Sequence, residues 1–461
     1  MNKVNEMELG TRNVPGLFRK YFIPTLLGML SMSAVAAVEG SFIGHGIGSD
    51  GIAAINICMP VLMVFTGIGL MAGAGASVIS SVLLSKGKAK AARVNATQAV
   101  VSVTLIALLP SALMMLFPSA TARLLGASPH LTPMVREYLL WFVPSLLFQM
   151  WCSVCLFLIR LEGSPRMAMA CNVISATLSV VFGWLFILKL EWGLMGAGLG
   201  YTVSLFIGGT AGLTYLTAFA EKLRLCPLKW NIRGLVYAFH NIAGQYRVGS
   251  SALLTEATLA TFLLVGNWMF MKYLGDDGVG AFGIACYYIP FVYMVGNAIA
   301  QSAQPIISFN YGLGSQARVR EAGRVALLTS VGGGLILTAV FTFFPHLLVG
   351  LFISTGNPAA RLAIEGFPYL SVAFVFFILN LCIIGYYQSV EDVGPATVFA
   401  LLRGFVFLIP CFILLPKALG TPGIWLALFL SEALTFGGIC LMRYSKALPV
   451  FLSRRGGNGR G

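Results

Sequence analysis

The stretch IGSDGIAAINICMP at residues 47–60 recurs, with three extra residues, as LGDDGVGAFGIACYYIP at residues 274–290. Farther along the chain, MGAGLGYTVS at residues 195–204 corresponds to PGIWLALFLS at residues 422–431. The separation between the paired segments stays at about 227–230 residues. A constant separation at several places is typical of an internal repeat. The chain is therefore predicted to consist of two homologous halves.

The composition assigns both halves to a membrane. Of the 461 residues, 58% are hydrophobic and 10% are charged, where soluble chains have about 45–50% and about 25%. The mean hydropathy is +0.86. A soluble protein of this length could not cover so much apolar side chain, and a disordered chain would contain far less of it. We therefore predict a polytopic membrane protein.

Apolar runs long enough to cross a bilayer divide the chain evenly. Because a spanning helix needs about 20 apolar residues, the sequence predicts twelve helices, six in each half, as an all-α protein of two pseudo-symmetric six-helix bundles. Six helices return the chain to the same side, so the repeat is parallel. We predict an N-lobe at residues 1–224, a cytoplasmic linker at 225–247 that includes a short amphipathic helix, and a C-lobe with a basic tail at 248–461. The predicted spans are 21–44, 54–84, 94–117, 136–159, 167–189, 196–220, 248–273, 281–310, 323–344, 364–388, 396–416 and 421–443.

The basic residues predict the orientation. The net charge of +14 does not indicate nucleic acid, because 23 of the 30 lysines and arginines fall on one side of the predicted spans and six on the other. Such an asymmetry places both termini in the cytoplasm, where the basic loops face anionic lipid. The six on the other side are Arg123, Arg136, Lys189, Lys272, Arg361 and Lys417.

Three carboxyl groups fall inside predicted spans: Glu39, Glu256 and Glu432. A carboxylate at the bilayer centre costs at least ~2.5 kcal/mol unless it faces a cavity or a partner. Burial raises its proton affinity, so such a group can load and release a proton, or attract a cation. The alternative is a hydrogen bond to a neighbouring helix and no more. For Glu432 we favour a structural ion pair with Arg403.

Two amides, Asn267 and Asn380, also fall in apolar runs and could coordinate an ion or bridge helices. The sequence contains neither a phosphate-binding loop nor a nucleophile motif. Cys152 and Cys155 lie in an apolar run with no second pair, so we predict no metal site. The chain is expected not to be an enzyme, to need no cofactor and to draw on an ion gradient.

Three segments resemble one known family. VEGSFIGHGIGSDGIAAINICMP at 38–60, QPIISFNYGLG beginning at Gln304, and YYQSVEDVGPATVFALLRGFVFLIP at 386–410 are similar to the multidrug and toxic compound extrusion (MATE) transporters. The resemblance covers nearly the whole chain. It implies a multi-pass inner-membrane antiporter, expected to be monomeric, that exports cationic or amphipathic compounds in exchange for H⁺ or Na⁺.

The resemblance also implies roles for particular residues. Glu39 falls where the family usually has an acid in the first helix, and Glu256 at a seventh-helix acid used for cation coupling in one branch. In the fifth helix, Ser179 and Gly183 stand where many members have an N-x-x-x-D pattern, so an acid is missing there. Asn380 lies near a tenth-helix aspartate of some members. Gln304 begins the most specific segment.

Two other functions are possible in the same broad superfamily. A flippase for lipid-linked oligosaccharides would require a basic cavity with several intramembrane arginines, and the sequence offers only Arg403. A dedicated exporter of an endogenous metabolite would share every feature described above, because a sequence does not identify which amphiphile fits.

Overall fold

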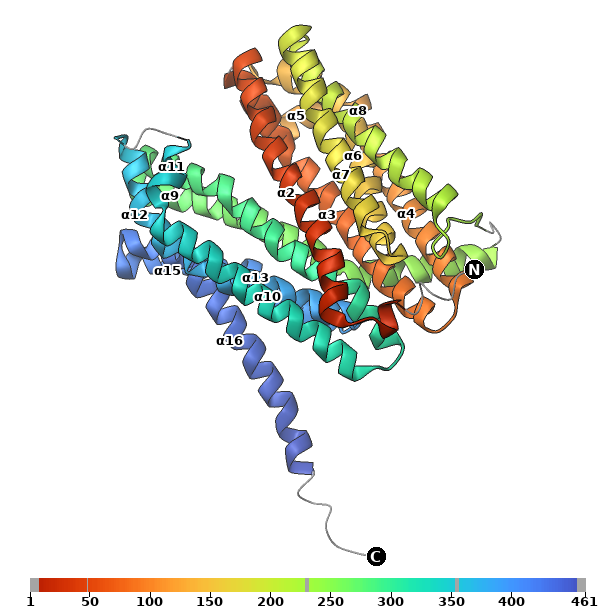
Figure 1. Ribbon diagram of the computed structural model, residues 1–461. Helices are drawn as coiled ribbons and strands as arrows, with labels where there is room; N and C mark the ends of the chain where they lie inside the picture. Colours follow the sequence, from red (N-terminus) through yellow and green to blue (C-terminus); the bar gives the residue numbers. More distant parts are fainter. Residues whose placement is uncertain (1–7, 48, 229–231, 353–355, 454–461) are drawn as a thin grey trace, which may run out of the picture. The chain divides into compact units, whose positions relative to one another are not determined.

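The structure is a computed structural model that describes residues 8–47, 49–228, 232–352 and 356–453. The side chains of 32–37, 39–41, 44–46, 49, 50, 52, 53, 232–235, 276 and 443–453 lie outside that description. The described residues form helices and no strand, which confirms the predicted all-α class (Figure 1). The elements are α2 (Val14–Gly46), α3 (Ser49–Ser85), α4 (Ala89–Leu116), α5 (Pro118–Leu124), α6 (Thr132–Glu162), α7 (Pro165–Gly183), η1 (Trp184–Lys189), α8 (Gly193–Thr214), η2 (Tyr215–Phe219), α9 (Ile232–Gly312), α10 (Gln316–Phe343), α11 (Pro345–Gly350), α12 (Pro358–Ser371), α13 (Ala373–Ser389), α14 (Val393–Leu401), η3 (Leu402–Val406), α15 (Leu408–Leu419) and α16 (Thr421–Ser453).

The lengths of the helices agree with the predicted twelve spans. Ten helical segments among the described residues are long and apolar enough to cross a membrane. The pair α12 and α13 adds an eleventh, with a bend of 47° between the two helices. Together with α2, which has 33 residues, these segments are consistent with six helices in each half.

The longest helical element, α9, differs from the prediction at its beginning. It starts at Ile232 and continues into the seventh predicted span, so the residues before 248 do not form the separate interfacial helix that the sequence suggested. No proline interrupts this stretch, and helical hydrogen bonding therefore continues into the span. At Gly275, with φ 65° and ψ −155°, the chain leaves helical geometry, and a new span begins at Asp277. A positive φ is a conformation that glycine adopts readily.

The chain divides into two compact units. Unit 1 comprises residues 1–257, 294–328 and 385–393, and unit 2 comprises the rest. In unit 1, α6 packs against α3, α4 and α8, and α2 packs against α7 (Figure 1). In unit 2, α16 packs against α12 and α15. The elements α9, α10 and α13 contribute to both units, as does α14 through its first residue. The two lobes expected from the sequence repeat stay a prediction.

Unit 1 contains a close crossing of α3 and α9. A Cβ added at Gly75 would collide with the backbone carbonyl of Gln245, and one at Gly249 with the carbonyl of Met71. Glycine on each helix therefore lets the two backbones approach each other directly, as small residues do between membrane helices.

Candidate functional site

A cavity of about 270 Å³ lies inside unit 1. Its wall is formed by α2, α3, α6, α7, η1 and α8, with Met294 of α9. Most of the lining is apolar or aromatic, and hydroxyl groups supply its polar part. The hydroxyl-bearing residues of the lining are Tyr138, Ser175, Ser179, Tyr201 and Ser204.

The lining determines which ligands the cavity suits. Apolar pockets with a few well-placed polar groups are typical of small-molecule sites, and methionines such as Met59 and Met294 adapt to different shapes. None of the described lining residues carries a charge. The cavity therefore suits an amphipathic compound, and a charged part of that compound would need a carboxylate from elsewhere.

Two of the sequence positions singled out in the fifth helix lie in this wall. Ser179 is 6% exposed, and both Ser179 and Gly183 line the cavity. The residues that stand in place of the N-x-x-x-D pattern therefore give this wall a serine hydroxyl and no acid, whereas the family resemblance implies an acid there in other members.

The two candidate coupling acids both lie on helices of unit 1. The side chain of Glu39 is not among those that the structure describes. Its position on α2 is four residues before Ile43, which lines the cavity. Glu256 is half-buried on α9, and its Cβ is 3.7 Å from the point where a Cβ at Gly67 of α3 would lie. Glu256 is therefore at the crossing of α3 and α9.

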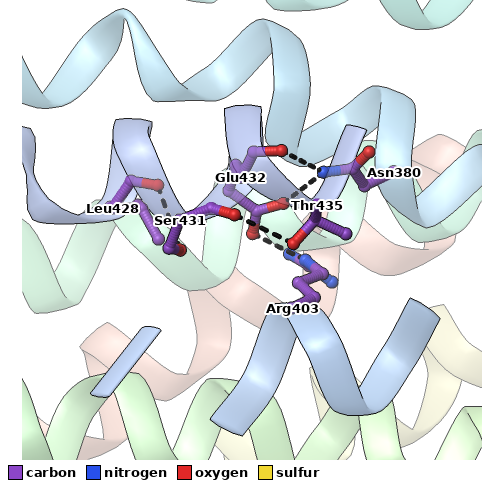
Figure 2. Close-up of polar contacts among 6 residues, drawn as sticks. All are labelled: Asn380, Arg403, Leu428, Ser431, Glu432 and Thr435. Atoms are coloured by element: carbon purple, nitrogen blue, oxygen red, sulfur yellow. Dashed lines mark hydrogen bonds and ion pairs between the residues drawn. The ribbon is translucent and has the colours of Figure 1, made fainter. Parts of the chain in front are cut away.

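Unit 2 contains a buried polar cluster of three side chains from three elements (Figure 2). Arg403 on η3 donates from Nε to Oε1 of Glu432 on α16 at 2.6 Å, and each side chain is 1% exposed. Asn380 on α13 donates from Nδ2 to Oε2 of Glu432 at 2.7 Å and to its main-chain oxygen at 2.9 Å. The structure thus brings together Arg403 and Glu432, and adds Asn380 to the pair.

The backbone around Arg403 departs from α-helical geometry. Residues 402–406 form a π-helical turn between α14 and α15. Such turns insert one residue into a helix and redirect its side chains, often at functional sites. The guanidinium stacks on the Phe377 ring, with Cζ 4.2 Å from the centroid. Within the described part of the chain, Nη1 and Nη2 of Arg403 and Oδ1 of Asn380 have no hydrogen-bond partner.

The remaining predicted residues lie apart from each other. Gln304 is 4% exposed and donates from Nε2 to the carbonyl of Ala74 at 3.1 Å, so it ties α9 to α3. Asn267, which lies in an apolar run, is nevertheless exposed, and its role in ion binding or helix bridging stays a prediction. The reason for its exposure is helical periodicity, because Asn267 shares a face with Leu264, Trp268 and Met271, which are 74%, 69% and 47% exposed.

A network of buried and half-buried amides in unit 1 was not predicted from the sequence. Asn95 of α4 is fully buried; its Nδ2 donates to Ser80 Oγ at 2.8 Å, and its Oδ1 accepts from Gln245 at 2.8 Å and from Asn241 at 3.0 Å. Gln98 accepts a further bond from Asn241. A local signal was present, since Asn95 and Gln245 stand near the beginnings of two predicted spans.

The described residues contain no group of three or more histidine, cysteine or acidic side chains that could hold a metal ion. The nine cysteines are all free thiols.

The comparison with protein families gives a match over both halves. The MatE family model matches residues 24–185 and 252–413. The two matches are of equal length, and their spacing agrees with the repeat found in the sequence.

Curated and solved proteins agree with this match. The multidrug export protein MepA of Staphylococcus aureus is 22% identical over 419 residues, which are 90% of each chain. A mutant of the MATE transporter VcmN of Vibrio cholerae superposes with a TM-score of 0.85 at 18% identity, over 95% of this chain and 97% of that one. A MOP superfamily transporter of Pyrococcus furiosus, described as having a binding pocket of reverse polarity that suggests a different function, superposes with a TM-score of 0.86 at 16% identity, over 96% and 98%.

The structural likenesses establish the fold, and the family match covers most of the chain in two copies. The resemblance seen in the sequence is thereby confirmed: the chain belongs to the MATE family of transporters.

Proposed function

We propose that the protein is a multidrug exporter of the inner membrane, with both termini in the cytoplasm, that exchanges cationic or amphipathic compounds for H⁺ or Na⁺. The observation that carries the proposal is the apolar cavity of unit 1, whose lining of methionine, tyrosine and serine suits amphipathic ligands. The curated relative MepA is a multidrug export protein. The protein works as a monomer and needs no cofactor.

Coupling is assigned to Glu39 and Glu256. A compound that is exported against its gradient must lose affinity in the outward-facing state, because a ligand shifts an equilibrium only by its differential affinity for two states. A carboxylate in a low-dielectric site attracts a cationic drug, and loses that attraction when it binds a proton or is neutralised by Na⁺. Loading of these acids from outside therefore favours release of the compound.

The test is efflux of a fluorescent cation from everted membrane vesicles under an imposed proton or sodium gradient. We expect the wild-type protein to respond to one of the two gradients, and Glu39→Gln to lose efflux while its membrane abundance stays normal. Glu137→Gln is the matched control, because Glu137 is an exposed acid on α6 outside the cavity. Normal efflux by Glu39→Gln would remove Glu39 from the mechanism.

Glu256 is tested in the same vesicles. Its position beside Gly67 lets a change of charge act on the packing of α3 and α9. We expect Glu256→Gln to weaken the dependence of efflux on the driving ion. If transport and ion dependence both stay unchanged, Glu256 serves only in helix packing.

The described cavity lining contains neither arginine nor lysine, so it offers no counter-charge for an anionic lipid-linked sugar. An endogenous amphiphile remains the alternative substrate. Vesicles that take up no foreign cation but exchange a compound extracted from the host cell would favour that reading.

A further inference from the structure

A second cavity, of about 760 Å³, lies in unit 1 where the beginning of α2 meets the connection between α6 and α7. It is larger than the apolar cavity and of opposite character. Four basic side chains line it: Arg12, Arg19, Lys20 and Arg166. Because like charges repel, such a gathering favours an anion from solution or from the membrane.

The charge in this basic cavity is only partly neutralised. Glu8 bonds Lys20 at 2.7 Å and Arg12 at 2.9 Å. The hydrogen bond from Lys20 and the two nearby positive charges lower the pKa of Glu8, so this carboxylate stays ionised and occupied with those two partners. Arg19 and Arg166 have no carboxylate partner among the described residues.

Other basic residues of unit 1 are used differently. Arg93 donates to the carbonyls of Glu221 and Lys222, at 2.6 and 3.1 Å. Arg318 donates to Asn310 and to the carbonyls of Leu9 and Arg12. These arginines hold chain segments together. Arg19 and Arg166, which face a cavity and are exposed, have donors left for a ligand.

The backbone contributes to the same cavity. Gly163 ends α6 in the left-handed region, with φ 100°, and turns the chain so that α7 begins at Pro165. The Oγ of Ser164, the N-cap residue, accepts a bond from Tyr215 at 2.7 Å and makes no cap hydrogen bond to the first turn of α7. The positive end of this 19-residue helix thus adds to the field of the arginines. A Cβ at Gly16 would meet no atom within 4 Å, so the space is open there.

Apolar surface continues directly from the basic cavity. Ile23 lines it and is 47% exposed, and Leu27, one turn later on the same face of α2, is 54% exposed. A free phosphate would use only the basic residues, whereas a lipid would use both parts. We infer that this cavity binds the phosphate headgroup of an anionic phospholipid, with its acyl chains lying along Ile23 and Leu27 of α2. This inference goes beyond the proposed transport and requires only that the chain spans a membrane.

The test uses the full-length protein in detergent and titrates phosphatidylglycerol by native mass spectrometry, with phosphatidylethanolamine and inorganic phosphate as comparison ligands. We expect the double variant Arg19→Gln, Arg166→Gln to bind phosphatidylglycerol roughly 30-fold more weakly, since each basic residue near an anionic lipid contributes about a factor of five. The charge-matched control is Lys88→Gln, Lys90→Gln, two exposed lysines at the beginning of α4, and it should bind like the wild type.

The double variant Arg19→Lys, Arg166→Lys keeps both charges and should restore most of the binding. This result would show that the glutamine variant binds weakly because it lacks the charges and not because it is misfolded. The inference is overturned if the control loses as much affinity as the arginine variant. It is equally overturned if phosphatidylethanolamine binds as tightly as phosphatidylglycerol, or if inorganic phosphate competes at the same concentration. An additional result decides between lipid and phosphate: Leu27→Asp should weaken the lipid complex alone.

Discussion

Arg403 Nε lies 2.6 Å from Oε1 of Glu432, and both side chains are 1% exposed, so the two charges neutralise each other inside unit 2. Breaking a buried pair by removing one partner costs about 3–5 kcal/mol, because the other charge stays buried without compensation. Replacing both partners by apolar residues of similar volume avoids that penalty. If the pair has a structural role, the single variant must therefore be less stable than the double variant.

We expect Glu432→Leu to reduce the amount of folded protein strongly, and Arg403→Met with Glu432→Leu to recover it. Abundance and unfolding temperature in detergent measure the difference. Efflux by the double variant then shows whether the ion pair also takes part in coupling. An ion pair that only stabilises the fold can be replaced without loss of transport. A double variant as unstable as Glu432→Leu would show that the pair is not the main interaction of either residue.

Close backbone contact between α3 and α9 gives a second prediction. Gly249→Ala places a Cβ against the carbonyl of Met71, and a backbone atom has no room to move without separating the helices. Overpacking costs about 1–3 kcal/mol, and more where backbone must shift. Gly244→Ala is the control on the same helix, because its added Cβ meets no atom within 4 Å.

Gly244→Ala should therefore raise the unfolding temperature slightly, through better helix propensity of up to about 1 kcal/mol, while Gly249→Ala lowers it. Equal changes in unfolding temperature for the two substitutions would contradict the close approach of the α3 and α9 backbones. The same comparison in the vesicle assay tests whether the crossing must also stay tight during transport.

The cavity of unit 1 predicts a change in substrate range. Ser179→Phe adds a ring to a cavity of about 270 Å³ and removes a hydroxyl, so bulky compounds should lose efflux before small ones. Ile174→Phe is the control, because Ile174 is on the same helix but 43% exposed and outside the lining. Resistance profiles with a series of cations of increasing size measure the effect. A uniform loss for all sizes would indicate misfolding instead of a narrowed site.

The sequence was sufficient for the twelve helices, the repeat and the candidate partners Arg403 and Glu432, because each depends on local apolar length or on a charge that cannot remain alone in a membrane. It was not sufficient to predict which side chains of a helix are buried and which are exposed. Asn267 and Asn380 both lie in apolar runs, yet one is exposed and the other fully buried against Glu432. Which face of a membrane helix is buried depends on its neighbours, since lipid and protein interior are both apolar.

Contacts between helices that are far apart in the sequence could likewise not be predicted from it. The bonds of Asn95 to Gln245 join α4 to α9 across 150 residues, and no local pattern links the two amides. The extension of α9 toward Ile232 is part of the same interaction, because Asn241 and Gln245 lie on it. A polar segment that was expected to lie at the interface is instead held by buried hydrogen bonds.

The connection between α13 and α14 carries the last prediction. Glu391 has φ 58°, a left-handed conformation that costs most residues about 1–2 kcal/mol and that asparagine tolerates better. Burial raises the pKa of Glu391 above its usual 4.5, opposed by the positive charge of Lys86. Because the folded protein then holds this proton more tightly than the unfolded chain, stability falls as the pH rises from the unfolded value through the folded one, and the loss persists at pH 7.

Glu391→Asn removes both unfavourable contributions, so we expect a higher unfolding temperature at pH 7 and a flatter stability profile above pH 4.5 than for the wild type. The gain should be about 1 kcal/mol from the backbone alone. Asp392→Asn makes the same charge change at a neighbouring residue that does not have a positive φ, and it should not reproduce the gain. Thermal unfolding in detergent between pH 4 and pH 8 measures both variants. An equal rise for Asp392→Asn would mean that net charge, and not the left-handed residue, limits the stability of this connection.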